Sequence, residues 1–260
     1  MKAEKWMHRL IPAGILALCV LCAPAHAQDE KGNPNKWRHS WTGYAWVPAF
    51  YGSARARSIP LDVNSSVSDT WNAVQDHGDG NFAGHYEGGP AKYKVMLDLN
   101  YWKLHFDRSA RIGDLEASPK SWIIELGGAI PVSQKSFGGG RGAKVEMLAG
   151  LRYSQLKLKV RNDTTDREEN PDQSWVDPFF GARYRYDFNN KWESSLRFDF
   201  GGLGIGSDFT YNLVTQFGYR FTKRNTVLAG WRILYQDFND GGFKWNVSQT
   251  GPFLGFNTQF

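Results

Sequence analysis

The feature that most constrains this chain is the alternation of apolar and polar residues along its C-terminal half. From Val176 to Phe260, apolar or aromatic residues occupy every second position in successive runs, and the last run ends at Phe260. Such alternation places the two kinds of side chain on opposite faces of a strand. Turn residues separate the runs at 189–191 and 240–242. The chain is therefore predicted to be all-β and antiparallel.

The second face of these runs decides between two β architectures. A soluble sandwich exposes a polar face and buries an apolar one. Here one face of each strand is rich in aromatic residues and the other in paired charges, so a soluble sandwich would leave one of the two faces in an unsuitable environment. In a membrane barrel the apolar face meets lipid, the polar face lines the lumen, and aromatic residues mark both interfaces. A mean hydropathy of −0.50 with 15% aromatic residues fits this pattern. We predict an antiparallel transmembrane β-barrel.

The N-terminus has the pattern of an export signal. Three basic residues in the first nine positions precede an apolar run at 10–22 and an Ala-His-Ala sequence at 25–27. The apolar run is shorter than the roughly 20 residues of a spanning helix, so we expect residues 1–27 to be a cleaved signal peptide. The remainder, 28–260, is expected to form one outer-membrane barrel domain.

The mature chain carries few of the signals that identify other protein classes. Both cysteines lie in the signal segment, so no disulfide is expected after cleavage. Loss of the signal removes three basic residues and one acidic residue from totals of 31 and 26, which leaves a net charge of +3. This charge is too mild to argue for nucleic acid as a partner.

About ten strands are predicted, with eight as the alternative because the run at 81–88 is weak. The turns at 88–91, 189–191 and 222–225, together with the longer 131–143 connection, are assigned to the periplasm, where barrel turns are short. The predicted strands lie near 37–51, 81–88, 92–107, 121–130, 144–160, 176–188, 192–200, 209–221, 227–235 and 243–260.

Three longer connections are expected outside the cell, at 52–80, 108–120 and 161–174. Within the first, residues 66–76 are predicted to form a short helix with Ser68 or Asp69 as N-cap. In the last strand the apolar positions change from odd to even near Gly251-Pro252. A β-bulge is predicted there.

The lumen face carries a repeated Gly-x-Arg pattern and a near balance of acids and arginines. Glycine leaves space that a guanidinium on a neighbouring strand can fill, and arginine pairs well with carboxylates. A barrel of this size is nearly filled by its own side chains, so a salt-bridged plug is favoured over a charged conduit or ligand site. The predicted network is Glu87, Asp98, Glu125, Glu146, Arg152, Asp177, Arg183, Arg185, Glu193, Arg197, Asp199, Arg220 and Arg232.

Catalytic and cofactor motifs are weak in this chain. Ser207-Asp208 with His85 or His105 is a conceivable hydrolytic group, but turn closure explains the first two residues better. The glycines of 201–206 precede no G-K-[ST] sequence, and the segment 76–81 lacks the closing Glu of a calcium loop. A non-enzymatic barrel without cofactor or metal is predicted, either structural or a narrow passive pore. The rivals are a lipid-modifying enzyme and a surface-binding protein that acts through 52–80 and 161–174.

The segment 175–260 resembles a group of small proteobacterial outer-membrane barrel proteins of unassigned role. The matching stretches are the Asp-Pro-Phe at 177–179, the Gly-Ala-Arg-Tyr-Arg-Tyr at 181–186, the glycine-rich 201–208, the Gly-Tyr-Arg-Phe at 218–221, and Asp-Gly-Gly-Phe at 240–243 with Gly251-Pro252. The resemblance implies a membrane-spanning barrel, lipid and lipopolysaccharide as neighbours, and recognition of the Phe260 strand by the outer-membrane assembly machinery. It implies no substrate, and a monomer is expected.

Overall fold

The computed structural model describes residues 35–57, 59–77, 81–105, 115–162 and 167–260. The predicted signal peptide lies outside these residues. Within them no helix is both long enough and apolar enough to cross a membrane.

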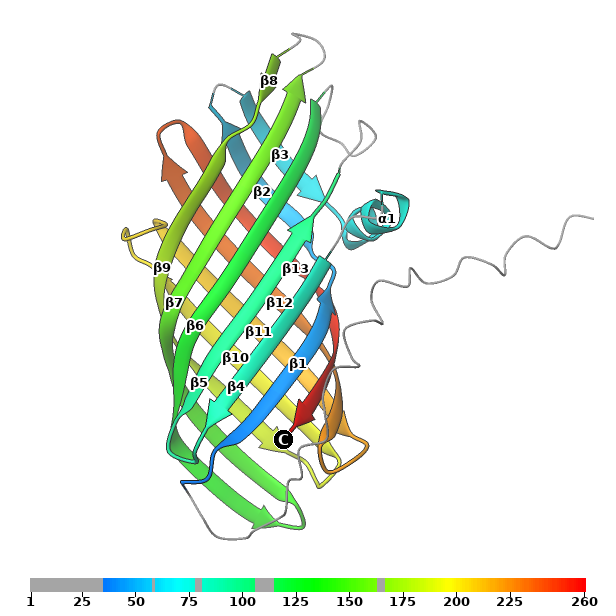
Figure 1. The fold of residues 1–260 in the computed structure, drawn as a ribbon, viewed down its shortest axis with the longest axis vertical. Coiled ribbons are helices and arrows are strands. Elements are labelled where there is room, and N and C mark those ends of the chain that lie inside the picture. The colour runs from blue at the N-terminus through cyan, green and yellow to red at the C-terminus, as the bar shows by residue number, and fades with distance from the viewer. Residues whose placement is uncertain (1–34, 58, 78–80, 106–114, 163–166) are drawn as a thin grey trace, which may run out of the picture.

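The strands form a closed antiparallel barrel, as the sequence predicts (Figure 1). Ten strands follow one another around it, and β13 pairs with β1 to close the ring. In the order in which they pair, these are β1 (Arg38–Trp46), β4 (Asn81–Gly89), β5 (Lys94–Lys103), β6 (Leu115–Gly138), β7 (Arg141–Asn162), β9 (Asp172–Asp187), β10 (Trp192–Gly202), β11 (Phe209–Arg220), β12 (Asn225–Asp240) and β13 (Phe243–Gln259). The ten-strand prediction is confirmed, and the 81–88 strand is β4.

The barrel seam closes at Phe260. The backbone N–H groups of His39 and Phe260 each donate to the other residue's carbonyl, at 3.1 and 2.9 Å, and the two rings stack. The short turns lie at this end of the barrel, which we call the periplasmic end because outer-membrane barrels keep their short turns there. The opposite end is called the outer end.

Additional elements occur at the outer end. The strand β2 (Ala49–Ala56) continues the path of β1 beyond Val47-Pro48 and pairs with the outer half of β13, while β3 (Ile59–Ser65) folds back on β2. A helix, α1 (Val67–His77), follows β3 and lies beside the barrel wall (Figure 1). A three-residue strand, β8 (Arg167–Glu169), pairs with the end of β7.

The connection predicted at 52–80 is therefore mostly regular structure. The predicted helix is confirmed, but its N-cap is Ser66 rather than Ser68 or Asp69. The Ser66 hydroxyl accepts from the backbone N–H of Asp69, and the Asp69 carboxylate accepts from the backbone N–H of Ser66. This reciprocal pair is a capping box, which favours helix initiation at this point.

The other predicted connections are also shorter than expected. The 131–143 segment is a continuation of β6 and β7, whose hairpin turns at Gly139-Gly140. Both glycines have positive φ angles of 61° and 76°, which a two-residue hairpin turn requires and most side chains disfavour. In the 108–120 connection, β6 begins at Leu115, and in the 161–174 connection β8 and the start of β9 are ordered strand.

The predicted bulge at Gly251-Pro252 is wrong. The register between β12 and β13 is continuous through this point, and odd-numbered residues of β13 stay on the inner face from Phe243 to Phe253. The apolar residues change parity because the lumen itself changes character. At the outer end they face inward, as Trp245 does, whereas toward the periplasm Leu254 faces outward and is 63% exposed.

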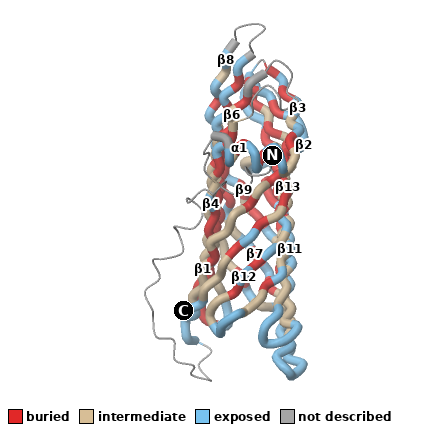
Figure 2. Tube along the Cα trace, turned by 90° about the vertical axis from the view of Figure 1, so that its right-hand side faces the viewer, coloured by how far each residue is buried: buried red, intermediate tan, exposed pale blue. Residues whose placement is uncertain are grey.

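Two bands of aromatic residues mark the membrane-facing surface. The outer band includes Tyr51, Phe82, Tyr101, Trp122, Tyr211 and Tyr235, and the periplasmic band includes Trp37, Tyr93, Phe188, Trp192, Tyr219 and Phe260. Exposed aliphatic and aromatic residues such as Leu126, Leu151 and Leu196 lie between them. In Figure 2 buried and exposed positions mix along the strands, and exposed segments dominate in the turns at the lower end. This pattern matches an outer-membrane barrel.

Candidate functional site

The middle of the lumen contains a balanced cluster of three arginines and three carboxylates. These are Arg152, Arg197 and Arg232 with Asp98, Glu125 and Asp199, and each is at most 9% exposed. They come from five strands, because Arg197 and Asp199 both lie on β10. The sequence predicted all six residues from the strand alternation, and the structure brings them together.

Arg152 is the most connected member of this central cluster. Its guanidinium donates to Glu125 at 2.8 Å, to Asp199 at 2.6 Å and to the Thr210 hydroxyl at 3.2 Å, and its side chain has no exposed surface. Arg197 bridges the same two carboxylates at 2.7 and 2.8 Å. Two cations thus clamp each carboxylate in a confined space, an arrangement that satisfies charges otherwise costly to bury.

Arg232 extends the cluster to the opposite wall. It donates to Glu125 at 3.2 Å, to Asp98 at 3.3 Å and to the Asn212 side chain at 3.0 Å. The Tyr44 hydroxyl accepts from Arg232 at 2.9 Å and donates to the Asp98 carboxylate. Polar contacts therefore span the lumen from β1 and β5 to β12.

Aromatic rings seal the cluster at its edges. The guanidinium carbons of Arg152 and Arg197 lie 5.2 and 5.5 Å from the centre of the Phe179 ring, and that of Arg232 lies 5.0 Å from the centre of the Trp46 ring. Such cation–π contacts are favourable and exclude water from one side of each guanidinium.

A second cluster lies nearer the periplasmic end. Arg183 contacts Glu87 and lies 2.7 Å from Glu146, while Arg185 donates to Glu87 at 2.7 Å and lies 3.3 Å from Glu146. Lys144 adds a further cation 2.7 Å from Glu146. The structure brings these four predicted members together, and the two clusters account for ten of the thirteen predicted residues.

The remaining three predicted residues have different environments. Asp177 is fully buried but accepts from the Ser207 backbone and hydroxyl and from the Trp175 indole, so it anchors the outer turn. Arg220 contacts Glu193 and also Asp187, at the periplasmic rim. These rim side chains are 25–42% exposed, so they lie outside the sealed part of the lumen.

Sequence reasoning missed several neutral members of the network. Tyr44, Asn212 and Thr210 complete the hydrogen bonds of the central cluster, and His85 lies 3.2 Å from Asp98 and 3.1 Å from Glu87, which links the two clusters. His85 shares a strand face with Glu87, two residues away, so alternation could have placed it there. The lumen positions of the neutral residues carry no comparable signal, because Asn, Thr and Tyr occur on either face.

The conceivable hydrolytic group is not assembled around His85. Ser207 donates to Asp177 at 2.9 Å, whereas the two nitrogens of His85 face Asp98 and Glu87 in the lumen. The better explanation from the sequence, that Ser207 closes the turn, fits this geometry.

The lumen changes character above the charged clusters. Trp46, Ile123, Leu234 and Phe253 form an apolar layer, and Gln236 donates to Ser154 at 2.8 Å beyond it. At the outer end the interior is a large apolar cluster that includes Phe50, Trp102, Leu156, Leu158, Trp175, Phe238, Phe243 and Trp245. An apolar interior is unusual for an outer-membrane barrel, whose lumen is ordinarily polar.

Comparisons with known proteins support the fold and little beyond it. The sequence matches no protein-family model and no curated protein. The structure is similar to the outer-membrane protease OmpT of Escherichia coli, with a TM-score of 0.50, 10% identity, and coverage of 87% of this chain and 97% of that chain. It also aligns with the Ail protein of Yersinia pestis at a TM-score of 0.39 and 10% identity, over 87% of this chain and 99% of that one. The resemblance to a group of unassigned role stays a prediction.

The similarity to OmpT corrects one prediction. The chain was predicted to be non-enzymatic because no catalytic motif was visible, but a protein of this barrel fold is a protease. Enzymes and non-enzymes share the architecture, so fold and motif scarcity do not exclude catalysis. The fold of this chain is that of an outer-membrane β-barrel.

Proposed function

We propose that this protein is an outer-membrane barrel with a closed lumen, in which the charged clusters act as a structural plug. The observation that carries the proposal is the burial of the central cluster. All six of its charged residues are at most 9% exposed, and each is held by a partner of opposite charge.

A conducting pore needs charges that water can solvate. In a wide channel, arginines and carboxylates face one another across water and remain largely exposed. Here they contact directly and are capped by the Phe179 and Trp46 rings. The apolar layer around Leu234 and the larger apolar cluster at the outer end add two further barriers to ions. Of the two roles predicted from sequence, structural barrel and narrow passive pore, this arrangement favours the first.

The proposal also covers the cellular setting. Residues 1–27 direct export and are removed, and the mature monomer folds with the help of the outer-membrane assembly machinery. Lipid and lipopolysaccharide surround the two aromatic bands. The outer end, where β2 and β3 extend beyond the outer band, is then the part of the molecule available to other molecules outside the cell.

Liposome swelling tests the closed lumen. Vesicles that contain the purified protein are diluted into isotonic solutions of small polar solutes of increasing size, such as glycine, arabinose and glucose. We expect swelling no faster than in protein-free vesicles, whereas a porin control swells quickly. Size-dependent uptake of these solutes by the wild-type barrel would contradict the proposal.

A double substitution provides a matched contrast. Arg152→Ala with Arg197→Ala removes two guanidinium groups from the central cluster and leaves both apolar barriers, so a rise in uptake should be confined to the smallest solute and should become larger when Leu234→Ala is added. Arg220→Ala with Lys191→Ala removes the same charge at the periplasmic rim and should leave the vesicles impermeable.

A further inference from the structure

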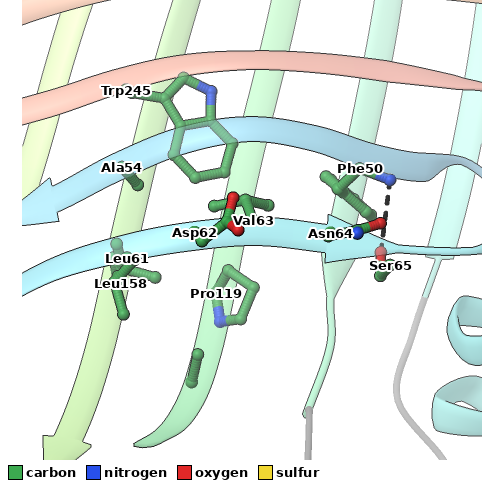
Figure 3. A pocket seen from close by; sticks show the side chains of 11 residues that line it. Phe50, Ala54, Leu61, Asp62, Val63, Asn64, Ser65, Pro119, Leu158 and Trp245 are labelled. Atoms are coloured by element: carbon green, nitrogen blue, oxygen red, sulfur yellow. Dashed lines mark hydrogen bonds between the residues drawn. The ribbon is translucent and has the colours of Figure 1, made fainter. Parts of the chain in front are cut away.

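An apolar cavity opens in the barrel wall at the outer end. It lies between β3 on one side and β6 and β7 on the other, and the space between its lining atoms, most of it open to solvent at the mouth, is about 490 Å³. Its lining includes Phe50, Leu61, Ala117, Pro119, Leu158 and Trp245 (Figure 3). Phe50, Leu158 and Trp245 are each at most 3% exposed and belong to the large apolar cluster.

The cavity lies where the strand ladder is interrupted. Among the described residues, β3 pairs with β2 alone, and β6 on the outer side of Lys120 pairs with β7 alone. The backbone hydrogen bond from the Leu104 N–H to the Pro119 carbonyl lies one residue beyond the end of β5, at the outer limit of the described pairing with β6. Both edges border the same cavity, so the described part of the wall has a lateral mouth there.

The position along the barrel relates this mouth to the membrane surface. Tyr51 of the outer aromatic band is three residues from Ala54 on β2, and Trp122 of the same band is three residues from Pro119 on β6. At about 3.3 Å per residue along a tilted strand, the cavity begins less than about 10 Å beyond the band. A molecule anchored in the outer leaflet can reach it.

The lining determines what the cavity accepts. Protein interiors are close-packed, and an unfilled apolar void forfeits dispersion contacts and lowers stability. Water gains little there, because it needs two to four polar partners, whereas apolar voids take up apolar molecules. A flexible hydrocarbon chain suits a cavity that is apolar, open at its mouth and bordered by two strand edges.

We propose that this cavity binds the hydrocarbon chain of an amphiphile, which enters from the side between β3 and β6 and packs against Trp245. The amphiphile is either a free fatty acid or a lipid of the outer leaflet. The site is separate from the charged lumen, so it does not depend on whether the barrel conducts.

Quenching of Trp245 by brominated chains tests the proposal. The full mature protein is placed in nanodiscs and titrated with 11-bromoundecanoate, and in a second arm the nanodisc lipid carries brominated acyl chains with no fatty acid added. Each measurement is repeated with Trp245→Phe, so that the difference isolates Trp245 from the membrane-facing tryptophans. We expect a quenching difference in at least one arm, saturable in the titration, and the arm identifies the source of the chain.

Filling the cavity provides the control. Ala117→Phe should weaken the titrated binding, or reduce the lipid-dependent quenching, at least tenfold, while Ala229→Phe on the lipid-facing side of β12 should leave it unchanged. Heat-modifiable gel mobility verifies that each variant is folded, and Ala54→Leu replaces Ala117→Phe should the latter fail to fold. No difference between wild type and Trp245→Phe in either arm, or equal quenching in the cavity-filled and control variants, would overturn the proposal.

Discussion

Replacement of Arg152 by methionine removes the most buried charge in the lumen while keeping much of its volume. The substitution deletes three hydrogen bonds, to Glu125, Asp199 and Thr210. Glu125 keeps Arg197 and Arg232, and Asp199 keeps Arg197 and Asn212. The central cluster then has three carboxylates facing two guanidinium groups.

The size of the effect follows from burial. Breaking a buried ion pair by removal of one partner costs about 3–5 kcal/mol, because an uncompensated charge stays in a medium of low polarity. The Arg152 and Asp199 side chains have no exposed surface, which favours a large cost. The arginines that still contact Glu125 and Asp199 reduce that cost. We expect Arg152→Met to lower the free energy of unfolding by about 3 kcal/mol, the low end of that range.

Arg220→Met is the matched control. Arg220 also contacts two acids, but they lie at the periplasmic rim, where water can solvate the orphaned carboxylates. Exposed and partly exposed pairs contribute about 1 kcal/mol or less. The assay is reversible denaturant unfolding in lipid vesicles, followed by tryptophan fluorescence. Equal losses for the two variants, or a loss below about 1 kcal/mol for Arg152→Met, would refute the idea that the cluster is a sealed plug.

Three further outcomes follow from the facing of side chains and from the outer end. Leu196→Arg on the lipid face, midway between the aromatic bands, should destabilise by about 2–4 kcal/mol in the same assay, and Gln216→Arg on the lumen face should cost less. Phe260→Asp should reduce the outer-membrane level and the heat-modifiable form without blocking export, because the seam bonds at this residue close the barrel; normal levels would contradict this. A hydrogen bond from Lys157 lowers the pKa of Asp172, so Lys157→Ala should return that pKa toward its usual value, which NMR titration measures. In the wild-type protein the slight stability that this pair adds is present above the usual aspartate pKa and should be lost as the pH falls through the lowered pKa.

Strand alternation was enough to predict the barrel, its strand number and most of the charged lumen. The residues Arg152, Glu125 and Asp199 were placed correctly because period-two alternation fixes the face of each residue once a strand is recognised. The ion-pair partner of each charged residue could not be predicted in this way, because it depends on the register between strands that are far apart in sequence. Arg220 illustrates this, because it shares the Gly-x-Arg pattern with Arg232 yet lies at the exposed rim.

The errors share a physical cause at the outer end. If apolar residues always faced lipid, the parity change near Gly251-Pro252 would require a bulge, and the prediction of a bulge rests on that premise. In the structure Trp245 faces an apolar interior above the charged clusters, and the strand needs no irregularity. The strand β3 and the cavity beside it were not predicted either. The run from Ile59 to Ser65 is short, and its outward-facing residues are polar, so it lacks the apolar lipid-facing side expected of a membrane strand.

Single-channel recording tests the closed lumen most directly. Purified wild-type protein is inserted into a planar lipid bilayer in 1 M KCl, and insertion is verified independently by protease protection of reconstituted vesicles. The structure predicts no ohmic conductance steps above the bare membrane. Regular steps of uniform size, with a reversal potential that shifts in a salt gradient, would contradict it and establish an open pore.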